Sequence, residues 1–279
     1  MKKLLTTTAV LSVLATPAFA DITIGGDMRW YYQSVDGATS SNLDSDINFK
    51  PSFTTETGMT VAADFNINHN GEDDGDNSLT LSKDQWSLDL GDTPSALDAI
   101  DDVTYLGYWL GTGSPSVDHA ARLTVKPMEN LTVHLSGAAD SNYGTTATAG
   151  YAYSARYKVM DAVTLGAGQM NNDDGSEALL LNATASLGAF GLGYEMHTDT
   201  TAAGVDTDTT TMGATYKMGS TLLGVEAGEV ESQGTVSSED MTYFIHHKIV
   251  PGLTAYAEFT DDAKQTNDET TLVGLAMKF

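Results

Sequence analysis

The chain has 279 residues, no cysteine and a formal net charge of −25 at pH 7, from 38 acidic and 13 basic side chains. The lack of cysteine excludes a disulfide framework and thiolate metal sites, and the excess of acid argues against binding nucleic acid or anionic lipid through a basic surface. After residue 20 no apolar run reaches the length of about 18 residues that a transmembrane helix needs.

The first twenty residues have the pattern of a secretory signal peptide. Lys2 and Lys3 precede an apolar stretch that ends in Pro17-Ala18-Phe19-Ala20, an A-x-A cleavage sequence. This stretch is too short to span a hydrocarbon core of about 30 Å, so it does not suit a membrane anchor. We predict a signal peptide at 1–20 and a mature domain at 21–279, with a net charge of −27 because two lysines and no acids are removed.

Short alternating runs of apolar and polar residues, separated by clusters of Gly, Asn and Asp, fill the mature chain. Such runs are typical of β-strands with one apolar face. They predict sixteen strands near 22–35, 46–55, 58–69, 78–83, 86–92, 118–126, 130–139, 149–159, 162–171, 177–187, 190–199, 208–218, 221–231, 239–249, 253–261 and 269–279. A count of fourteen strands is the alternative, and it would move the assignment of the third loop.

The links between the predicted strands alternate in length. Those after even-numbered strands are tight, such as Asp84-Gln85 and Gly219-Ser220, whereas most of those after odd-numbered strands are longer and hold acidic runs such as 71–76. Short turns at one end and long loops at the other are the topology of an outer-membrane β-barrel. A soluble sandwich gives no reason for this sorting.

The alternation also separates an apolar face from a polar one within each strand. In the first strand Ile24, Trp30 and Tyr32 share one face, and Asp27 and Gln33 share the other. Because hydrocarbon cannot satisfy polar groups, the apolar face is predicted to contact lipid or a neighbouring subunit, and the polar face to line a water-filled lumen.

The last nine residues form an alternating strand in which Val273, Leu275, Met277 and Phe279 share one face. An alternating strand with a terminal Phe resembles the closing strand of Gram-negative outer-membrane β-barrels. With the strand count, it makes the chain similar to the general, non-specific trimeric porins, including those of alphaproteobacteria. The resemblance implies an all-β fold, a 16-stranded antiparallel transmembrane β-barrel with an inward-folded third loop. It also implies a homotrimer in the cell outer membrane, in contact with lipid and lipopolysaccharide.

The longest link, residues 93–117, follows a strand that ends in Leu90-Gly91. Its first part resembles the third loop of the trimeric porins, which narrows the lumen, so we expect 93–117 to be the constriction loop. Thr93 can cap a short helix that has Pro94 at its first position. In that helix Leu97 and Ile100 would share one face and pack against the barrel wall.

The charged residues expected at the constriction come from the loop and from the strands. Asp98, Asp101 and Asp102 lie off the apolar face of the predicted helix and are expected to face the channel; the alternative is a solvated acidic turn outside the barrel. The basic residues with lumen-facing parity are Arg29, Lys50, Arg122 and Arg156. For these the alternative is an ion pair with Asp27, Asp64 or Asp89 that only holds the wall together.

Opposite charges across one aperture would produce a transverse field that orients dipolar solutes and slows apolar ones. We therefore predict an outer-membrane channel for passive diffusion of small hydrophilic solutes and ions. The net charge predicts a preference for cations. A substrate-specific channel is the alternative within the same class.

The remaining signals do not favour catalysis or metal binding. The six histidines lack the spacing of a zinc site, and the acidic runs at 72–76 and 173–175 do not match a calcium-binding EF-hand loop. We therefore expect no cofactor and no metal. His134 and Ser136, on one lumen-facing strand, are the nearest approach to a hydrolytic site, but no G-x-S-x-G elbow supports them. An enzyme is not expected, and a barrel enzyme or a surface adhesin is a weaker alternative.

Overall fold

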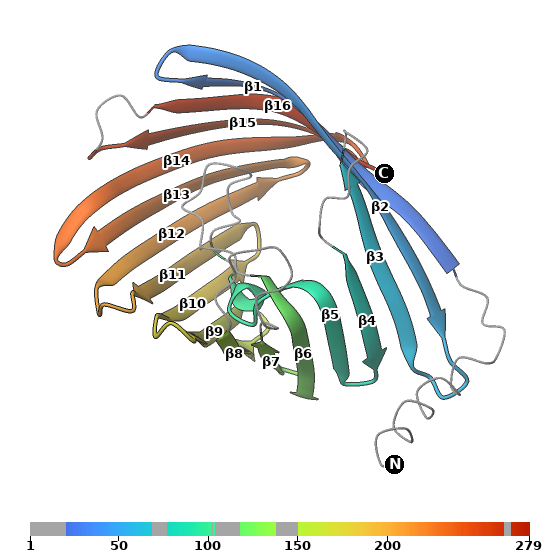
Figure 1. Ribbon diagram of the computed structural model, residues 1–279. Coiled ribbons are helices and arrows are strands. Elements are labelled where there is room, and N and C mark those ends of the chain that lie inside the picture. The colour runs from blue at the N-terminus through green and yellow to red at the C-terminus, as the bar shows by residue number, and fades with distance from the viewer. Residues whose placement is uncertain (1–20, 69–76, 102, 104–117, 138–149, 265–268) are drawn as a thin grey trace.

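The computed structural model describes residues 21–68, 77–101, 103, 118–137, 150–264 and 269–279 (Figure 1). These form a closed antiparallel barrel of 16 strands, in which each strand pairs with its neighbours in sequence and β1 pairs with β16. The fold class and the strand number match the prediction. In the described part of the chain, no helix is long and apolar enough to cross a membrane.

The bounds of the elements agree with the expected ranges within about two residues, except at the starts of β2 and β14. They are β1 Asp21–Val35, β2 Ala38–Thr54, β3 Thr60–Asn68, β4 Ser78–Lys83, β5 Trp86–Pro94, η2 Asp98–Ile100, β6 Asp118–Met128, β7 Leu131–Gly137, β8 Gly150–Met160, β9 Val163–Asn172, β10 Glu177–Leu187, β11 Phe190–Thr200, β12 Asp206–Met218, β13 Thr221–Ser232, β14 Thr235–Val250, β15 Leu253–Asp262 and β16 Thr270–Lys278.

Links after even-numbered strands are short, as expected, and define what we call the turn end of the barrel; the opposite end is the loop end. Two links at the loop end are shorter than predicted. Asp36-Gly37 has φ angles of 51° and 79°, and Gln233-Gly234 has 52° and 75°. Positive φ at both positions is the geometry of a two-residue type I′ hairpin. As a result β2 begins at Ala38 rather than near 46, and β14 begins at Thr235 rather than near 239.

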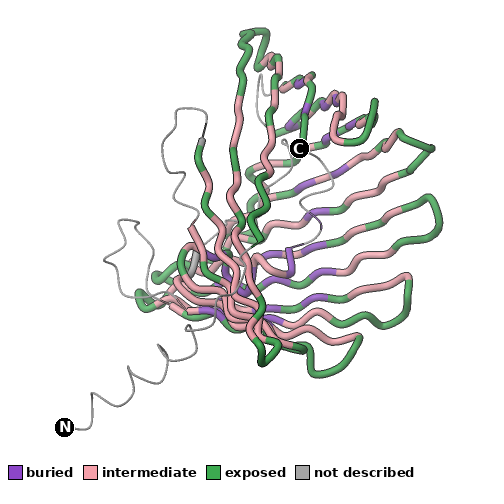
Figure 2. Tube along the Cα trace, turned by 90° about the vertical axis from the view of Figure 1, so that its right-hand side faces the viewer, coloured by how far each residue is buried: buried purple, intermediate pink, exposed green. Residues whose placement is uncertain are grey.

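The two faces of the strands are sorted as the alternation predicts. Large apolar side chains point outward: Ile22 is 65% exposed and Trp30 is 47% exposed, and the same outward face carries Phe65, Tyr153, Tyr243 and Leu275. The buried side chains lie on the opposite parity and recur along the strands from β8 to β16 (Figure 2). The barrel therefore has its apolar surface outside and its buried polar groups inside.

The predicted closing strand completes the barrel. β16 pairs with β1 from Asp27 opposite Lys278 to Val35 opposite Thr270. Beyond it, Phe279 and Gly26 exchange two backbone hydrogen bonds of 3.1 Å. A side chain at Gly26 would overlap the carbonyl oxygen of Asp46 and lie 3.0 Å from the Phe279 ring. Glycine at this position therefore lets the chain end seat against β1.

A bulge at Gly91 redirects the end of β5. The pairing with β6 shifts between Leu90 and Thr93, and Gly91 has a φ of 109°, which residues with a side chain rarely adopt. The amide of Asp92 donates to the carbonyl oxygen of Asn77 at 2.9 Å. Bulges bend a strand and change the direction of the residues after it, and here the chain continues into the barrel interior.

Candidate functional site: the interior of the barrel

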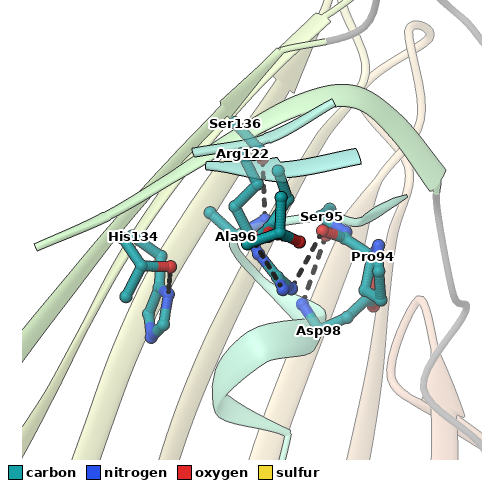
Figure 3. Close-up of polar contacts among 10 residues, drawn as sticks. Pro94, Ser95, Ala96, Asp98, Arg122, His134 and Ser136 are labelled. Atoms are coloured by element: carbon teal, nitrogen blue, oxygen red, sulfur yellow. Dashed lines mark hydrogen bonds and ion pairs between the residues drawn. The ribbon is translucent and has the colours of Figure 1, made fainter. Parts of the chain in front are cut away.

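Residues 95–101 lie inside the barrel and contact the inner face of strands β7 to β10 (Figures 1 and 3). Four wall side chains bond to the backbone of this segment. Ser136 accepts from the amide of Ala96 at 2.7 Å, Ser154 donates to the Ala96 carbonyl, Arg156 donates to the Ala99 carbonyl at 2.9 Å, and Asn182 donates to the Ile100 carbonyl. Buried backbone groups need such partners, so the wall is built to hold the segment.

Apolar packing supports the same placement. Leu97 is 3% exposed and Ile100 is fully buried, and they form one cluster with wall residues Ala152, Met170, Ala178 and Leu180. Gly168 makes room for the segment, because a side chain there would come within 2.8 Å of Leu97 Cδ1. Full burial of one such aliphatic side chain contributes about 1.5–3 kcal/mol. The three-residue spacing of Leu97 and Ile100 predicts this face correctly.

The predicted helix cap is wrong. Thr93 and Pro94 are the last residues of β5 and pair with β6, so the helix starts later, at Asp98, with no side-chain cap on its N-cap residue. A local turn takes over this role. Ser95 Oγ accepts from the amides of Leu97 and Asp98 at 3.2 Å each, and Asp98 Oδ2 accepts from the amide of Ser95 at 3.0 Å. Continued strand pairing displaces the helix start by several residues.

The three acidic residues expected to face the channel differ in their surroundings. Asp98 is half-buried and takes part in the turn with Ser95. Asp101 is buried, and its amide donates to the Asp98 carbonyl at 3.2 Å. Asp102 lies outside the described residues. The Asp98 carboxylate therefore stabilises the turn of the segment itself.

The four expected basic residues fall into two groups. Arg156 contacts the segment at the Ala99 carbonyl, whereas Arg122 Nη1 donates at 3.2 Å to the carbonyl of Pro94, the residue just before the segment. Arg29 and Lys50 lie on β1 and β2, away from these contacts.

The ion pairs considered as the alternative are present. Arg29 lies 3.3 Å from Asp27, Lys50 lies 2.6 Å from Asp64, and Arg122 lies 3.3 Å from Asp89. Arg29 also pairs with Asp44 at 3.1 Å, a partner that sequence reasoning missed. Three of the four expected basic side chains are therefore matched by carboxylates on their own or a neighbouring strand.

The wall formed by β11 to β16, across the barrel from the paired charges on β3 to β6, holds residues that the sequence reasoning did not single out. Glu195, Glu226 and Glu258 are each about 2% exposed on the inner face. Glu258 Oε1 lies 3.0 Å from His246 Nε2, and Asn182 Nδ2 donates to Glu195 at 3.4 Å. The sequence did offer one signal for these glutamates, which is that each has the inward-facing parity of its strand.

This wall is also less polar than predicted. Phe244, Tyr256 and Leu272 are buried on its inner face. The Phe244 ring occupies the space that a side chain at Gly224 would need, and Tyr256 does the same at Gly274. The inner face therefore combines polar anchors with an apolar cluster around residues 95–101, which we call the docked segment, and it is partly aromatic on β14 and β15.

His134 and Ser136, the nearest approach to a hydrolytic pair, are both engaged elsewhere. His134 Nδ1 is 3.0 Å from Thr124 Oγ1, and Ser136 Oγ accepts from Ala96. Figure 3 shows the two side chains beside the docked segment. Among the described residues, no group of three or more His, Asp or Glu side chains is placed to hold a metal ion.

Comparison with known proteins gives the fold and the family. The barrel is similar to a porin solved at 1.8 Å (TM-score 0.74, 18% identity, covering 93% of this chain and 100% of that one) and to a mutant of Rh. blastica porin (TM-score 0.74, 16% identity, 93% and 100%). It is also similar to a loop L8 deletion mutant of OmpT, an outer membrane protein of Vibrio cholerae (TM-score 0.77, 14% identity, 93% and 99%). No curated protein matched the sequence. The family model of the Gram-negative porins matches residues 7–268, and the chain therefore belongs to the Gram-negative porin family and forms a channel in the outer membrane.

Proposed function

We propose that this porin admits small hydrophilic solutes and ions by passive diffusion through an aperture narrowed by the third loop, and that it prefers cations. The channel itself follows from the family. The observation that carries the aperture is the attachment of residues 95–101 to the inner wall, since a segment held inside a closed barrel reduces the cross-section open to solutes. We assign the constriction to the range 93–117 expected from the sequence, although Thr93 and Pro94 still belong to β5.

The proposed cation preference rests on the charges inside the barrel. Lys50 and Arg122 each have a carboxylate within 3.3 Å, and Arg29 lies between two. Paired charges leave little net positive potential at a distance. The glutamates of the opposite wall add negative charge, and a lumen lined by one sign raises the local concentration of ions of the other sign.

In this proposal the site residues have different roles. Arg122 and Arg156 hold the segment and line the aperture beside it, while Arg29 and Lys50 line the wall of β1 and β2. Asp98 and Asp101 belong to the segment that narrows the lumen, and Asp102 is assigned to the same acidic group by its place in the sequence. No step of conduction requires a covalent intermediate, so we propose a channel without enzymatic activity.

The assembly and its surroundings complete the proposal. We assign residues 1–20 to a cleaved signal peptide and 21–279 to the barrel. The exposed apolar outer face suits contact with membrane lipid and with two further copies of the chain. We expect acidic residues at the loop end, such as Asp173 and Asp174, to contact lipopolysaccharide through divalent cations. A homotrimer is expected on this basis.

Planar-bilayer recording of the purified mature protein tests the proposal. We expect large conductance steps, often in threes, and a reversal potential of cation-selective sign under a KCl gradient. Swelling of proteoliposomes in neutral sugars should slow steadily as the sugar mass rises. Folded, heat-modifiable protein without conductance would contradict the channel. Saturable flux of a single solute would favour the substrate-specific alternative.

A further inference from the structure

Three glutamates stand at alternate strands of one wall. Glu195 is on β11, Glu226 on β13 and Glu258 on β15, and all three side chains are buried on the inner face. Their heights in the barrel can be compared through the strand registers, because paired residues lie on rows perpendicular to the strands.

The registers show which way the strands tilt. A paired row that starts at Tyr31, well inside β1, runs through Tyr256 and His246 to Leu222, beside the turn at 219–220. Such a row therefore descends toward the turn end as it passes from β1 back to β13. Residues at equal height along the barrel axis must then lie progressively further toward the loop end than the paired residues; we call the line through them the level line. For strands about 4.8 Å apart and tilted by about 35–45°, the climb is about two to three residues for every two strands.

The first pair of glutamates follows this level line. From Glu258 the paired row leads through Phe244 on β14 to Gly224 on β13. Glu226 lies two residues beyond Gly224, toward the loop end, which is the climb that a level line requires. Glu258 and Glu226 therefore stand at about the same height.

The same step repeats toward the docked segment. From Glu226 the row leads through Gly213 on β12 to β11, where Glu195 lies two residues beyond the paired position. One more step reaches Gly168 on β9, the residue on which Leu97 packs. The three glutamates therefore continue, along the wall from β11 to β15, the level at which residues 95–101 are attached.

The basic residues of this wall lie away from the glutamates. Strands β11 to β16 contain three of them, Lys217, Lys248 and Lys278, and all are exposed near the turn end. The other titratable groups on its inner face include His197, His246 and Tyr256 and the carboxylates nearer the loop end; His246 lies 3.0 Å from Glu258. By contrast, the strand carboxylates on the opposite side accompany Arg29, Lys50 and Arg122.

From this geometry we infer that Glu195, Glu226 and Glu258 determine the cation preference of the pore, and that the acidic residues of the loop segment contribute less. The inference deepens the proposed function and rests on it. The class of ligand is the small hydrated monovalent cation and the cationic solute, which pass the wall without a fixed binding site. Buried charges are screened by salt less than exposed ones, so these carboxylates act on a passing ion without touching it. Asp98, in comparison, is only half-buried, so salt screens its charge more.

The test is the permeability ratio of K⁺ to Cl⁻, taken from reversal potentials in a KCl gradient. The variants are Glu195→Gln, Glu226→Gln, Glu258→Gln and the triple variant. The matched control is Glu229→Gln, the same substitution on the same strand β13 but exposed on the outer face. Asp98→Asn tests the loop. One charge about 10 Å from the ion path, partly screened, changes the ratio by about 2-fold.

We expect the ratio to fall about 2-fold in each single variant and about 8-fold in the triple variant, to stay unchanged in Glu229→Gln, and to change less in Asp98→Asn than in any glutamate variant. A folded triple variant with the wild-type ratio overturns the inference, as does a larger effect of Asp98→Asn. If the triple variant fails to form a heat-modifiable barrel, the single variants decide by the same comparison. Wild-type protein that conducts but prefers anions overturns this inference alone, whereas folded protein without conductance overturns the proposed channel and the inference with it.

Discussion

Leu97→Ala tests what holds the docked segment in the lumen. Leu97 is 3% exposed and packs over Gly168 within the cluster formed with β8 to β10. Truncating a buried leucine to alanine costs about 2–5 kcal/mol. The barrel itself does not depend on this contact, because its strands are joined by their own backbone ladders. The loss therefore weakens attachment of the segment and leaves the barrel folded.

The size of the effect depends on the contacts that remain. Hydrogen bonds from Ser136, Ser154, Arg156 and Asn182 still hold the segment, each contributing about 1 kcal/mol. A loss of about 2 kcal/mol or more raises the population of the undocked segment by a factor of about thirty or more. We expect Leu97→Ala channels to show greater open-channel noise with brief steps of higher conductance, and proteoliposomes to admit larger sugars.

Adding Ser136→Ala should increase the effect, because it leaves the buried amide of Ala96 without its acceptor, at a cost of about 1–3 kcal/mol. Leu165→Ala is the control, since Leu165 is on the same strand as Gly168 but 44% exposed on the outer face. Single-channel recording and sugar-swelling rates measure the outcome. A folded double variant with wild-type noise and the wild-type size limit would refute the view that this contact narrows the pore.

Two further predictions concern the seam and the paired wall. Gly26→Val should lower the temperature at which the folded barrel is lost on a heat-modifiability gel, at a cost of about 1–3 kcal/mol or more, because the added side chain overlaps the carbonyl of Asp46; Gly137→Ala, where the nearest atom would be 3.8 Å away, should change it little. Lys50→Met should leave that temperature nearly unchanged, since a pair in which the lysine is half exposed contributes about 0–1 kcal/mol. The same variant should raise the K⁺ to Cl⁻ ratio by about 2-fold, because Asp64 is left unpaired, and a falling ratio would contradict the sign of the argument.

The strands were predictable because the sorting of side chains between lipid and water acts at every second residue and needs no knowledge of partners. The prediction failed where both faces are polar, as in the first residues of β2 and β14. These stretches are strands because a two-residue turn precedes each of them. Asp36-Gly37 is itself a strong hairpin signal. The sequence therefore did indicate the start of β2, through its turn residues rather than through the alternation of apolar and polar residues.

The interior was less predictable than the barrel, since parity gives a direction but not a partner. Parity alone assigns Arg29 a direction, whereas its pairing with Asp44 depends on register. Thr93 was misassigned as a cap because β5 continues to Pro94 through pairing with a distant strand. Ser136 and Asn182 could not be recognised as anchors for a similar reason, since they lie 40 and 82 residues from the backbone groups that they bond.

Register therefore connects the turns of this protein to its pore. The hairpin at Asp36-Gly37 places Arg29 opposite Asp44, and a loop one residue longer would turn one of the two side chains to the outer face. The same dependence applies to the docked segment, whose carbonyls are satisfied by side chains from β8 and β10. A short helix leaves such carbonyls without internal partners, so a shift in the register of β8 or β10 would leave them without a side-chain donor. The lengths of surface turns therefore help to determine where the docked segment lies and which charges face one another inside the barrel.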